Sequence, residues 1–545
     1  MGASTAGQDR LMPSVNRFAG VLLCFLLVAA TAPVADQLAA DRIHGHVQFL
    51  ASDELEGRDT GSRGHAIAAQ YVASQFTALG LKAGGPGGGW FLPVPLRRAS
   101  HARPPQIALV VGGKSRLIDN VDVGLRPSLT EKQRSIDAGM VFVGHGIVAP
   151  RLGIDEYAGL DVKGKIVVVL RGAPAGLPAE VAAHLDLTKD QIAAAKGAIG
   201  IAELTYGNPP GYNPAPGLSR PVLDWVDASG AVGKAGSIGT VMVFSPSLSR
   251  QVFQGAVQSL DQVGSSADRP IHGFALLGRL SISATSSWQD FSSPEVIGML
   301  PGGDPRLAQE YVVLMAHLDH LGVKPVAQPG EDAIYNGALD NAAGVATMIE
   351  AARTFTAAGK PPRRSILFIA NTGEEPGMLG ADYFASHPTV ALDHIVAAVN
   401  LDMPLLTYDF TDVIAFGADH STVGRTVAEA AGAMGIAVSP DPMPQERLFV
   451  RSDHYRLVQH GIPSVFLMTG YANGGRAAWA RYLTFFYHQP SDDLAQPIRW
   501  AAGARFAELN YRIARALANA DPRPSWYPGD YFGDLFAPAG PRAER

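Results

Sequence analysis

The chain has 545 residues, 47% of them hydrophobic, which is enough for more than one domain with a sizeable core. Its formal net charge of -6 is small for this length, and the basic residues form no stripe, which argues against nucleic acid as a partner.

Near the N-terminus, two arginines precede the apolar run Phe18–Ala30, and small residues follow up to position 35. This order is typical of a secretory signal peptide, whereas a membrane anchor would need a longer apolar run. We therefore predict that residues 1–35 are a signal peptide and that the protein is exported, to the periplasm or out of the cell. No stable membrane span would remain after cleavage.

The only cysteine, Cys24, lies inside that apolar run. Cleavage would leave a mature chain without cysteine, which excludes intrachain disulfides and thiolate ligands. Any metal ion would then be held by His, Asp and Glu side chains.

Two helices are predicted next, the first with Ile43, Val47 and Leu50 on one face and the second from about His65 to Leu79. Between them lies a loop rich in charged residues, Glu54–Arg58. From its composition alone, this loop could be a solvated turn.

From about residue 138 to about 285 the chain is rich in glycine and proline and contains short β-rich runs. Its histidines are scattered and it has no cluster of metal-binding residue types. We expect a small β-rich domain, residues 138–285, inserted into an α/β domain that comprises residues 36–137 and 286–520. The β-rich runs are Met140–Val143, Lys165–Leu170, Ile199–Ala202 and Gly239–Phe244.

In the second half, three apolar runs have the composition of buried strands, and metal-binding residue types follow each of them. The runs are Tyr311–Ala316, Ile366–Ala370 and Ile395–Leu401, followed by His317, by Glu374 and Glu375, and by Asp402. With the helix Gly344–Arg353 between two of them, this order predicts an open, mostly parallel α/β sheet with a site beyond the strand carboxyl ends. The last segment, residues 521–545, is rich in proline and aromatics and is expected to be an extended tail.

Two histidines and three carboxylates in this pattern suit zinc or a comparable divalent ion, and suffice for two ions if one carboxylate bridges them. Asp340 and His488 would reach the site from loops, and Asp340, which precedes a helix, is the natural bridge. One of Glu374 and Glu375 would bind metal and the other would act as general base beside a water molecule. Asp319 is placed to accept the second ring N–H of His317.

Six motifs and an N-terminal signature carry a resemblance to the M28 family of zinc aminopeptidases, in its secreted bacterial form. The six motifs, in order, are HLDHLG, GALDNAAGVATMIEAAR, GEEPGMLGADYF, NLDMP, SDHYRLVQHGIPSVF and YHQPSDD, and the signature is LASDELEGRDTGSRG. The insert, with GHGIVAP, DVKGKIVVVLRG and AAAKGAIGI, is similar to a protease-associated (PA) domain. The resemblance implies a zinc-exopeptidase fold, with helices on both sides of a mixed, mostly parallel sheet, and gives Glu54–Arg58 a structural role near the site.

The resemblance further implies two zinc ions that share Asp340, with His317 and Asp402 completing one ion and Glu375 and His488 the other. Glu374 would be the general base, and Asp319 would orient His317. Substrate contacts would come from the run that contains Arg451, His454 and Tyr455, although a structural role for these residues is an equal alternative.

The implied activity is that of an exported aminopeptidase acting on peptide substrates. A carboxypeptidase of the same fold acting on acidic dipeptides stays open, because Arg447, Arg451 and Arg476 could bind a terminal carboxylate. A glutaminyl cyclase is disfavoured, since those enzymes resemble this fold with one zinc. A non-catalytic binding protein is disfavoured as well, because every ligand and the base are present.

Overall fold

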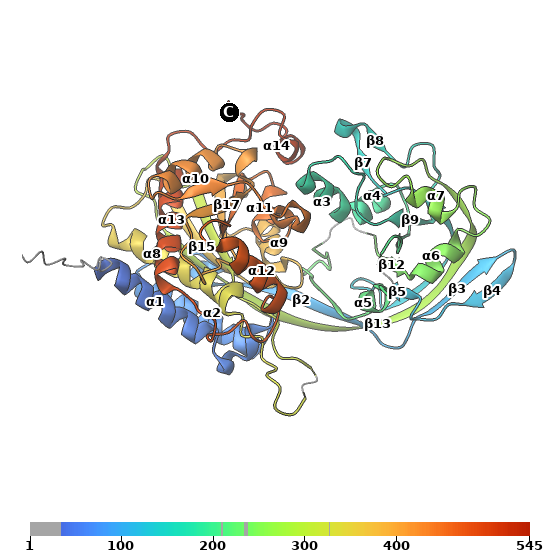
Figure 1. Ribbon diagram of the computed structural model, residues 1–545, viewed down its shortest axis with the longest axis horizontal. Helices are drawn as coiled ribbons and strands as arrows, with labels where there is room; N and C mark the ends of the chain where they lie inside the picture. The colour runs from blue at the N-terminus through green and yellow to red at the C-terminus, as the bar shows by residue number, and fades with distance from the viewer. Residues whose placement is uncertain (1–33, 209–210, 234–237, 326–327, 545) are drawn as a thin grey trace, which may run out of the picture.

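The computed structural model describes residues 34–208, 211–233, 238–325 and 328–544 (Figure 1). The apolar run Phe18–Ala30 and Cys24 lie outside the described residues, so the predicted signal peptide stays a prediction. Within the described ranges, no helix is both long and apolar enough to cross a membrane.

A central sheet organises the half of the molecule drawn at the left of Figure 1. Four strands, β15, β14, β16 and β19, run parallel to one another, while β13 and β17 flank them antiparallel. This mixed, mostly parallel sheet confirms the predicted fold class. In spatial order the strands are β11 (Val222–Trp225), β2 (Phe91–His101), β13 (Phe274–Leu300), β15 (Ser365–Asn371), β14 (Tyr311–His317), β16 (Ile395–Leu401), β19 (Ser464–Thr469), β17 (Asp412–Phe416) and β18 (Ala437–Ser439).

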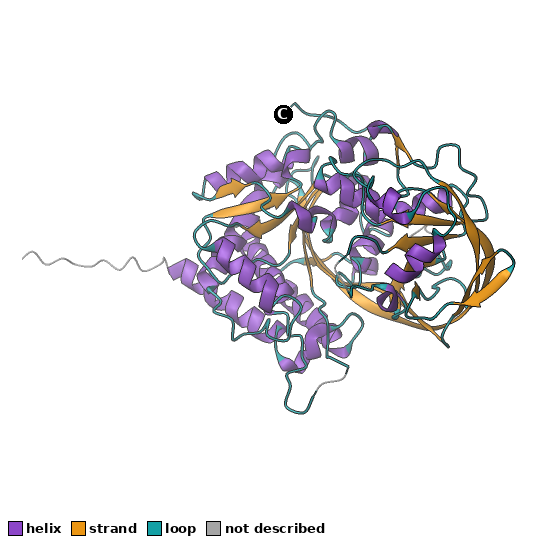
Figure 2. Ribbon diagram, turned by 45° about the vertical axis from the view of Figure 1, so that its right-hand side comes forward, coloured by secondary structure: helices purple, strands orange, loops and turns teal. Residues whose placement is uncertain are grey.

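Helices cover both faces of this sheet, which is why its strands read as continuous apolar runs. In β14, Val312 and Leu314 share a core with helices on one face, while Val313 and Met315 pack on the other face against a cluster that includes Phe384. Figure 2 shows the helices packed around the orange strands. The first face carries α1 (Val34–Leu50), α2 (Arg63–Ala78), α8 (Ala343–Ala357) and α13 (Trp500–Asn519), and the second carries α9 (Leu379–Ser386) and α11 (His454–Val458).

The second half of the molecule, which we call the insert, is built on another sheet that shares β13 with the first. The first part of β13 pairs with β6 and β3, and the second part pairs with β2 and then β15. The predicted boundary at 285 therefore lies within a continuous strand. The strands of this sheet, in spatial order, are β4 (Lys114–Leu117), β3 (Gln106–Val111), β13, β6 (Gln133–Phe142), β9 (Ile166–Leu170), β10 (Gly200–Leu204), β12 (Val241–Phe244) and β5 (Val123–Leu125).

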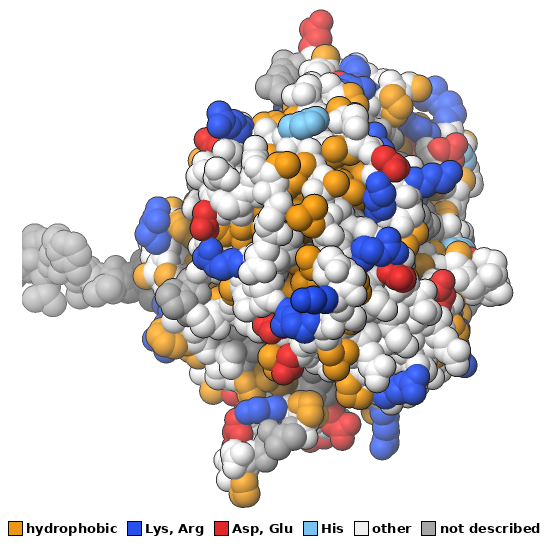
Figure 3. Space-filling model, turned by 90° about the vertical axis from the view of Figure 1, so that its right-hand side faces the viewer, with side chains coloured by type: hydrophobic (Ala, Val, Ile, Leu, Met, Phe, Trp, Pro, Cys, Tyr) orange, Lys and Arg blue, Asp and Glu red, His pale blue; other side chains and the backbone are white. Residues whose placement is uncertain are grey.

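Five short helices complete the described part of the insert, and one of them, α3, faces the first half of the molecule (Figure 1). On the outer face of the insert, basic and acidic side chains are intermixed (Figure 3). One exposed ion pair of the insert joins Arg279 and Asp137, with 3.0 Å between guanidinium and carboxylate. The helices are α3 (Ala179–Leu187), α4 (Lys189–Ala195), α5 (Ala215–Leu218), α6 (Pro246–Val252) and α7 (Leu260–Gly264).

The C-terminal segment is not the extended tail that its composition predicts. It contains helix α14 (Tyr531–Phe536), and its aromatic side chains enter the main core. Phe532 is fully buried, and Trp526, also buried, donates from its indole N–H to the carbonyl oxygen of Gly461 at 2.8 Å. Burial of these large rings stabilises a compact end of the chain.

One histidine joins three segments that are distant in sequence. The ring of His420 lies 2.7 Å from a carboxylate oxygen of Glu180 in α3 and 2.6 Å from one of Asp530, just before α14. Burial alone would lower the pKa of His420, but the hydrogen bonds to Asp530 and Glu180 outweigh it and raise the pKa to about 9.

This raised pKa predicts a pH-dependent contribution to stability. The contribution, about 3 kcal/mol for a shift from 6.5 to about 9, is fully present below pH 6.5 and is lost as the pH rises through 9. In urea unfolding followed from pH 6 to 10, the stability advantage of the wild type over His420→Gln should shrink across this interval. Parallel pH profiles of the two proteins would contradict the assignment.

Candidate metal centre

The first group of candidate ligands lies at the carboxyl ends of two neighbouring parallel strands. His317 ends β14, Asp402 follows β16, and Asp340 comes from the turn that precedes α8. The Nε2 atom of His317 lies 3.1 Å from Oδ1 of Asp402 and 3.2 Å from Oδ1 of Asp340. All three residues are buried, and their ligand atoms lie within 4.8 Å of one another. The structure thus brings these predicted ligands together.

A second group forms on the other side of Asp340. The Nε2 atom of His488 lies 3.3 Å from Oδ2 of Asp340 and 3.3 Å from Oε2 of Glu375. One carboxylate oxygen of Asp340 therefore faces His317, and the other faces His488. This is the geometry that a bridging carboxylate needs.

His320, which the sequence analysis did not single out, also reaches this second group. Its Nδ1 lies 2.6 Å from Oε1 of Glu375, and its ligand atom is within 4.8 Å of those of Asp340 and Glu375. Its other ring nitrogen is buried and makes no hydrogen bond to any described residue.

The distances from ring nitrogen to carboxylate oxygen distinguish His488 from His320. Ligands bound to a tetrahedral zinc ion at 2.0–2.1 Å stand about 3.3 Å apart. The separations of His317 and His488 from their carboxylates, 3.1 to 3.3 Å, match this value, whereas 2.6 Å between His320 and Glu375 is the length of a direct hydrogen bond. This favours His488 as the ligand and His320 as the residue that orients Glu375.

The carboxylate of Asp319 has a different partner from the one predicted. The Nδ1 atom of His317 lies 3.1 Å from the main-chain carbonyl oxygen of Asp319, not from its carboxylate. The carboxylate instead accepts hydrogen bonds from Thr60 Oγ1 at 2.9 Å and from the backbone N–H groups of Glu374 and Glu375 at 3.2 and 3.4 Å. Asp319 therefore holds the loop that carries Glu374 and Glu375, the glutamate loop, with its side chain. It orients His317 with its backbone.

Further side chains that the sequence analysis missed hold the remaining ligands. The carboxylate of Asp492 accepts the backbone N–H of Asp340 at 3.0 Å, and the hydroxyl of Ser452 donates to Asp402 at 2.5 Å. Both lie in motifs that had been singled out, YHQPSDD and SDHYRLVQHGIPSVF, but short polar residues there are equally common as caps and turns.

Arg58 was the least foreseeable of these supports. Its guanidinium donates to four main-chain carbonyl oxygens, those of Leu50, Leu318, Asn336 and Gly337, and only 1% of the residue is exposed. Leu318 follows the ligand His317, and Gly337 lies three residues before Asp340. Arg58 therefore joins the N-terminal loop to both ligand loops, the structural role that the resemblance implies for Glu54–Arg58.

The shifted pKa values in the cluster indicate that a positive ion would stabilise its carboxylates. Burial and neighbouring carboxylates raise the pKa of Glu374 well above its usual value, and burial and Asp340 raise that of Glu375 to about 8. Burial would also raise the pKa of Asp340, but the imidazoles of His317 and His488 lower it below the ordinary range. A divalent cation in this position would favour the ionised carboxylates, so the donor set fits such an ion.

A small cavity of about 30 Å³ opens onto the cluster. Its wall contains the general-base candidate Glu374 together with Arg451, Ser452 and Tyr487. Burial and the nearby carboxylates raise the pKa of Tyr487, so this side chain stays a neutral phenol.

Of the three predicted substrate contacts, only Arg451 lines this cavity. Tyr455 is buried, and its hydroxyl lies 2.7 Å from Nδ1 of His184 in the insert. His454 is buried between Phe449 and Phe466, with ring centroids 5.4 and 5.6 Å away. The expectation that Tyr455 or His454 contacts substrate is therefore corrected, because both side chains turn away into the core.

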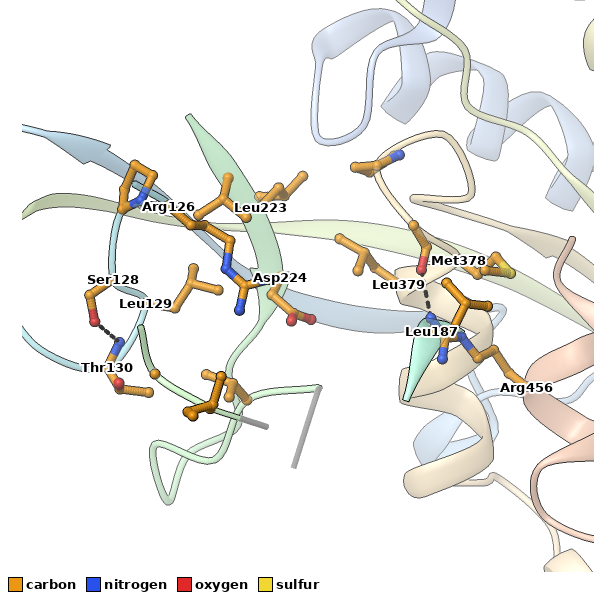
Figure 4. A pocket seen from close by; sticks show the side chains of 17 residues that line it. Arg126, Ser128, Leu129, Thr130, Leu187, Leu223, Asp224, Met378, Leu379 and Arg456 are labelled. Atoms are coloured by element: carbon orange, nitrogen blue, oxygen red, sulfur yellow. Dashed lines mark hydrogen bonds between the residues drawn. The ribbon is translucent and has the colours of Figure 1, made fainter. Parts of the chain in front are cut away.

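A larger cavity, of about 230 Å³, lies between the insert and the first half of the molecule (Figure 4). Arg126 of the insert lines it, together with Leu223 and Asp224 of β11 and with Met378 and Leu379. The latter two residues follow the glutamate loop in sequence, but none of the candidate ligands lies in its wall.

A family model described as Peptidase family M28 matches residues 295–514, a range that contains every ligand candidate and Glu374. The matched residues are an M28 peptidase domain. We refer to residues 295–514 as the M28 domain.

The M28 domain and its surroundings are similar to proteins from several organisms. A probable zinc metalloprotease of Pyrenophora teres f. teres is 37% identical over 109 residues, 20% of this chain and 22% of that protein, and one of Pyrenophora tritici-repentis is 36% identical over 109 residues. The chain thus spans under a quarter of the length of these curated relatives. Among solved structures, an aminopeptidase from Aneurinibacillus sp. strain AM-1 shares the fold, with a TM-score of 0.50 and 18% identity over 89% of this chain and 95% of that one.

Proposed function

We propose that this protein is an exported, zinc-dependent metallopeptidase that removes N-terminal residues from peptides. The observation that carries the proposal is the position of Asp340, whose two carboxylate oxygens face separate sets of ligands, in a cavity that Glu374 also lines. The M28 domain and the aminopeptidase of similar fold support it. The predicted signal peptide supports export.

We assign the ligands as the resemblance implies. His317 and Asp402 would hold one zinc ion, Glu375 and His488 would hold a second, and Asp340 would contact both. When bound, such ions polarise a peptide carbonyl and make a water molecule more acidic.

The side chain of Glu374 does the proton transfer in this mechanism. The carboxylate of Asp319 accepts a hydrogen bond from the backbone N–H of Glu374. Glu374 lines the cavity but is not among the carboxylates that lie at ligand distance from His317 or His488. It would accept a proton from the attacking water at a carboxylate oxygen and pass that proton to the nitrogen of the leaving amine. The neutral phenol of Tyr487, which lines the same wall, would donate to the oxygen of the reacting carbonyl.

A carboxypeptidase acting on acidic dipeptides is the second candidate, and one observation favours it. Arg451 lines the cavity beside the metal ligands, where its guanidinium could bind a terminal carboxylate. Its Nη1 atom already donates to the backbone oxygen of Glu446 at 3.0 Å, which limits the donors that stay free for a substrate.

A substrate panel separates the two candidates. Purified protein would be assayed on aminoacyl chromogenic amides, on their N-acetylated forms and on N-acetylated dipeptides that end in Asp or Glu. An aminopeptidase cleaves only the substrates with a free amine. Cleavage of blocked, acid-ended peptides would replace the proposal with the carboxypeptidase, and no cleavage of any substrate would refute both.

Asp319→Asn tests the support of the glutamate loop. The amide retains one acceptor oxygen but has no charge for the backbone N–H groups of Glu374 and Glu375, so activity should fall by about 10- to 100-fold. The zinc content should stay close to that of the wild type, because His317 is oriented by the backbone carbonyl of residue 319. Equal activity of variant and wild type would refute this role.

A further inference from the structure

The wall of the metal cavity includes a loop whose position depends on two distant parts of the chain. We call residues 444–451 the rim loop. Leu448 and Arg451 line the cavity, whereas Phe449 between them points to the opposite side and is buried. The contacts that hold Phe449 therefore also determine which side of the rim loop faces the cavity.

Phe449 is held by rings from outside the rim loop. Its ring centroid lies 5.1 Å from that of Phe532 in helix α14, 4.9 Å from that of His420 and 5.7 Å from that of Tyr455. Phe532 is fully buried, so the C-terminal helix supplies a packed contact and not a surface one. Edge-on and tilted ring contacts of this kind add to the stabilisation that burial of the rings provides.

Helix α3 of the insert holds the same loop from a second direction. A carboxylate oxygen of Asp186 lies 3.3 Å from Nη1 of Arg447 in the rim loop. Two residues earlier in α3, Nδ1 of His184 lies 2.7 Å from the hydroxyl of Tyr455, and its ring packs against Phe532 with 5.9 Å between centroids. The hydrogen bonds of His420 to Glu180 and Asp530 join α3 to the segment that begins α14.

We propose that α3 and α14 form a clasp that positions the rim loop, so that Leu448 and Arg451 present the substrate-binding side of the metal cavity. This inference rests on the proposed peptidase function and assigns His184, Asp186, Tyr455 and Phe532 as positioning residues. None of them lines the cavity. The insert thus acts on substrate binding through the loop and not by direct contact.

The double variant Arg447→Asn with Tyr455→Phe removes two of the three polar contacts that α3 makes here, those of Asp186 and His184. Arg447 has a φ of 55°, which asparagine tolerates, and phenylalanine keeps the ring of Tyr455 in place. KM for an aminoacyl amide should rise about tenfold, and kcat should change less than KM, because the ligands and Glu374 are unaffected. Deuterium uptake should increase in residues 444–451 and stay unchanged in β14.

A matched control comes from an exposed ion pair of the insert. Arg279→Gln breaks the exposed pair with Asp137 and should change neither KM nor uptake in the rim loop. Unchanged uptake in the double variant would overturn the clasp, and increased uptake with an unchanged KM would overturn its role in substrate binding. If the wild type cleaves no peptide, the proposed function fails, while deuterium uptake still decides whether the clasp exists.

Discussion

Replacing Glu374 by Gln is expected to lower kcat for peptide hydrolysis by about 10²–10⁴-fold. The amide has nearly the same shape as the carboxylate but cannot accept the proton of the attacking water. Glu374 is not one of the side chains at ligand distance from His317 or His488, so the zinc content should not change. Steady-state kinetics and metal analysis of the same preparation would measure both quantities.

An exposed glutamate provides the control for this experiment. Glu429→Gln, on the surface of α10 (Val423–Gly432), makes the same chemical change away from the cluster and should keep wild-type kcat. If Glu374→Gln retains more than a tenth of the wild-type kcat, another group must be the base. If it instead loses zinc, Glu374 is a ligand and the assignment of the two adjacent glutamates must be exchanged.

Arg58→Met is expected to destabilise the protein by about 4 kcal/mol or more. Four buried carbonyl oxygens lose their donor, and each such loss costs about 1–3 kcal/mol when no water replaces it. Because two of these carbonyls belong to the loops that carry His317 and Asp340, zinc affinity should fall as well.

Chemical unfolding and zinc titration of Arg58→Met would give both effects. Arg63→Met, at the exposed first residue of α2, changes the same residue type with no buried partner and should stay within about 0.5 kcal/mol of wild type. Similar unfolding midpoints for the two variants would show that Arg58 does not organise the ligand loops.

The arrangement of the ligands could be predicted from the sequence because it follows from strands. Buried parallel strands read as continuous apolar runs, and residues just after such runs must meet at one edge of the sheet. His317, the two adjacent glutamates and Asp402 are placed by this rule alone. The roles of the two glutamates could not be separated in this way, since adjacent residues share one position on the edge.

Contacts between distant segments could not be predicted, because no local pattern in the sequence indicates them. Nothing local distinguishes a carbonyl acceptor from a carboxylate acceptor for His317, so the role of the Asp319 side chain was mispredicted. Tyr455 looked like a substrate contact because it lies in a motif, yet its partner His184 is 271 residues away. The proline and aromatic residues of the C-terminal segment predict an extended tail, although Phe532 is buried against helices of the insert and of the M28 domain.

The measurement that tests the central claim most directly is a zinc titration of chelated protein, with bound zinc and hydrolysis of an aminoacyl amide followed together. We predict that activity is absent without metal and is restored fully when two zinc ions are bound per chain. In His488→Ala the second ion should bind more weakly, while His317 and Asp402 still hold the first. Full activity in metal-free protein, or full binding of zinc with no hydrolysis of any peptide, would contradict the account.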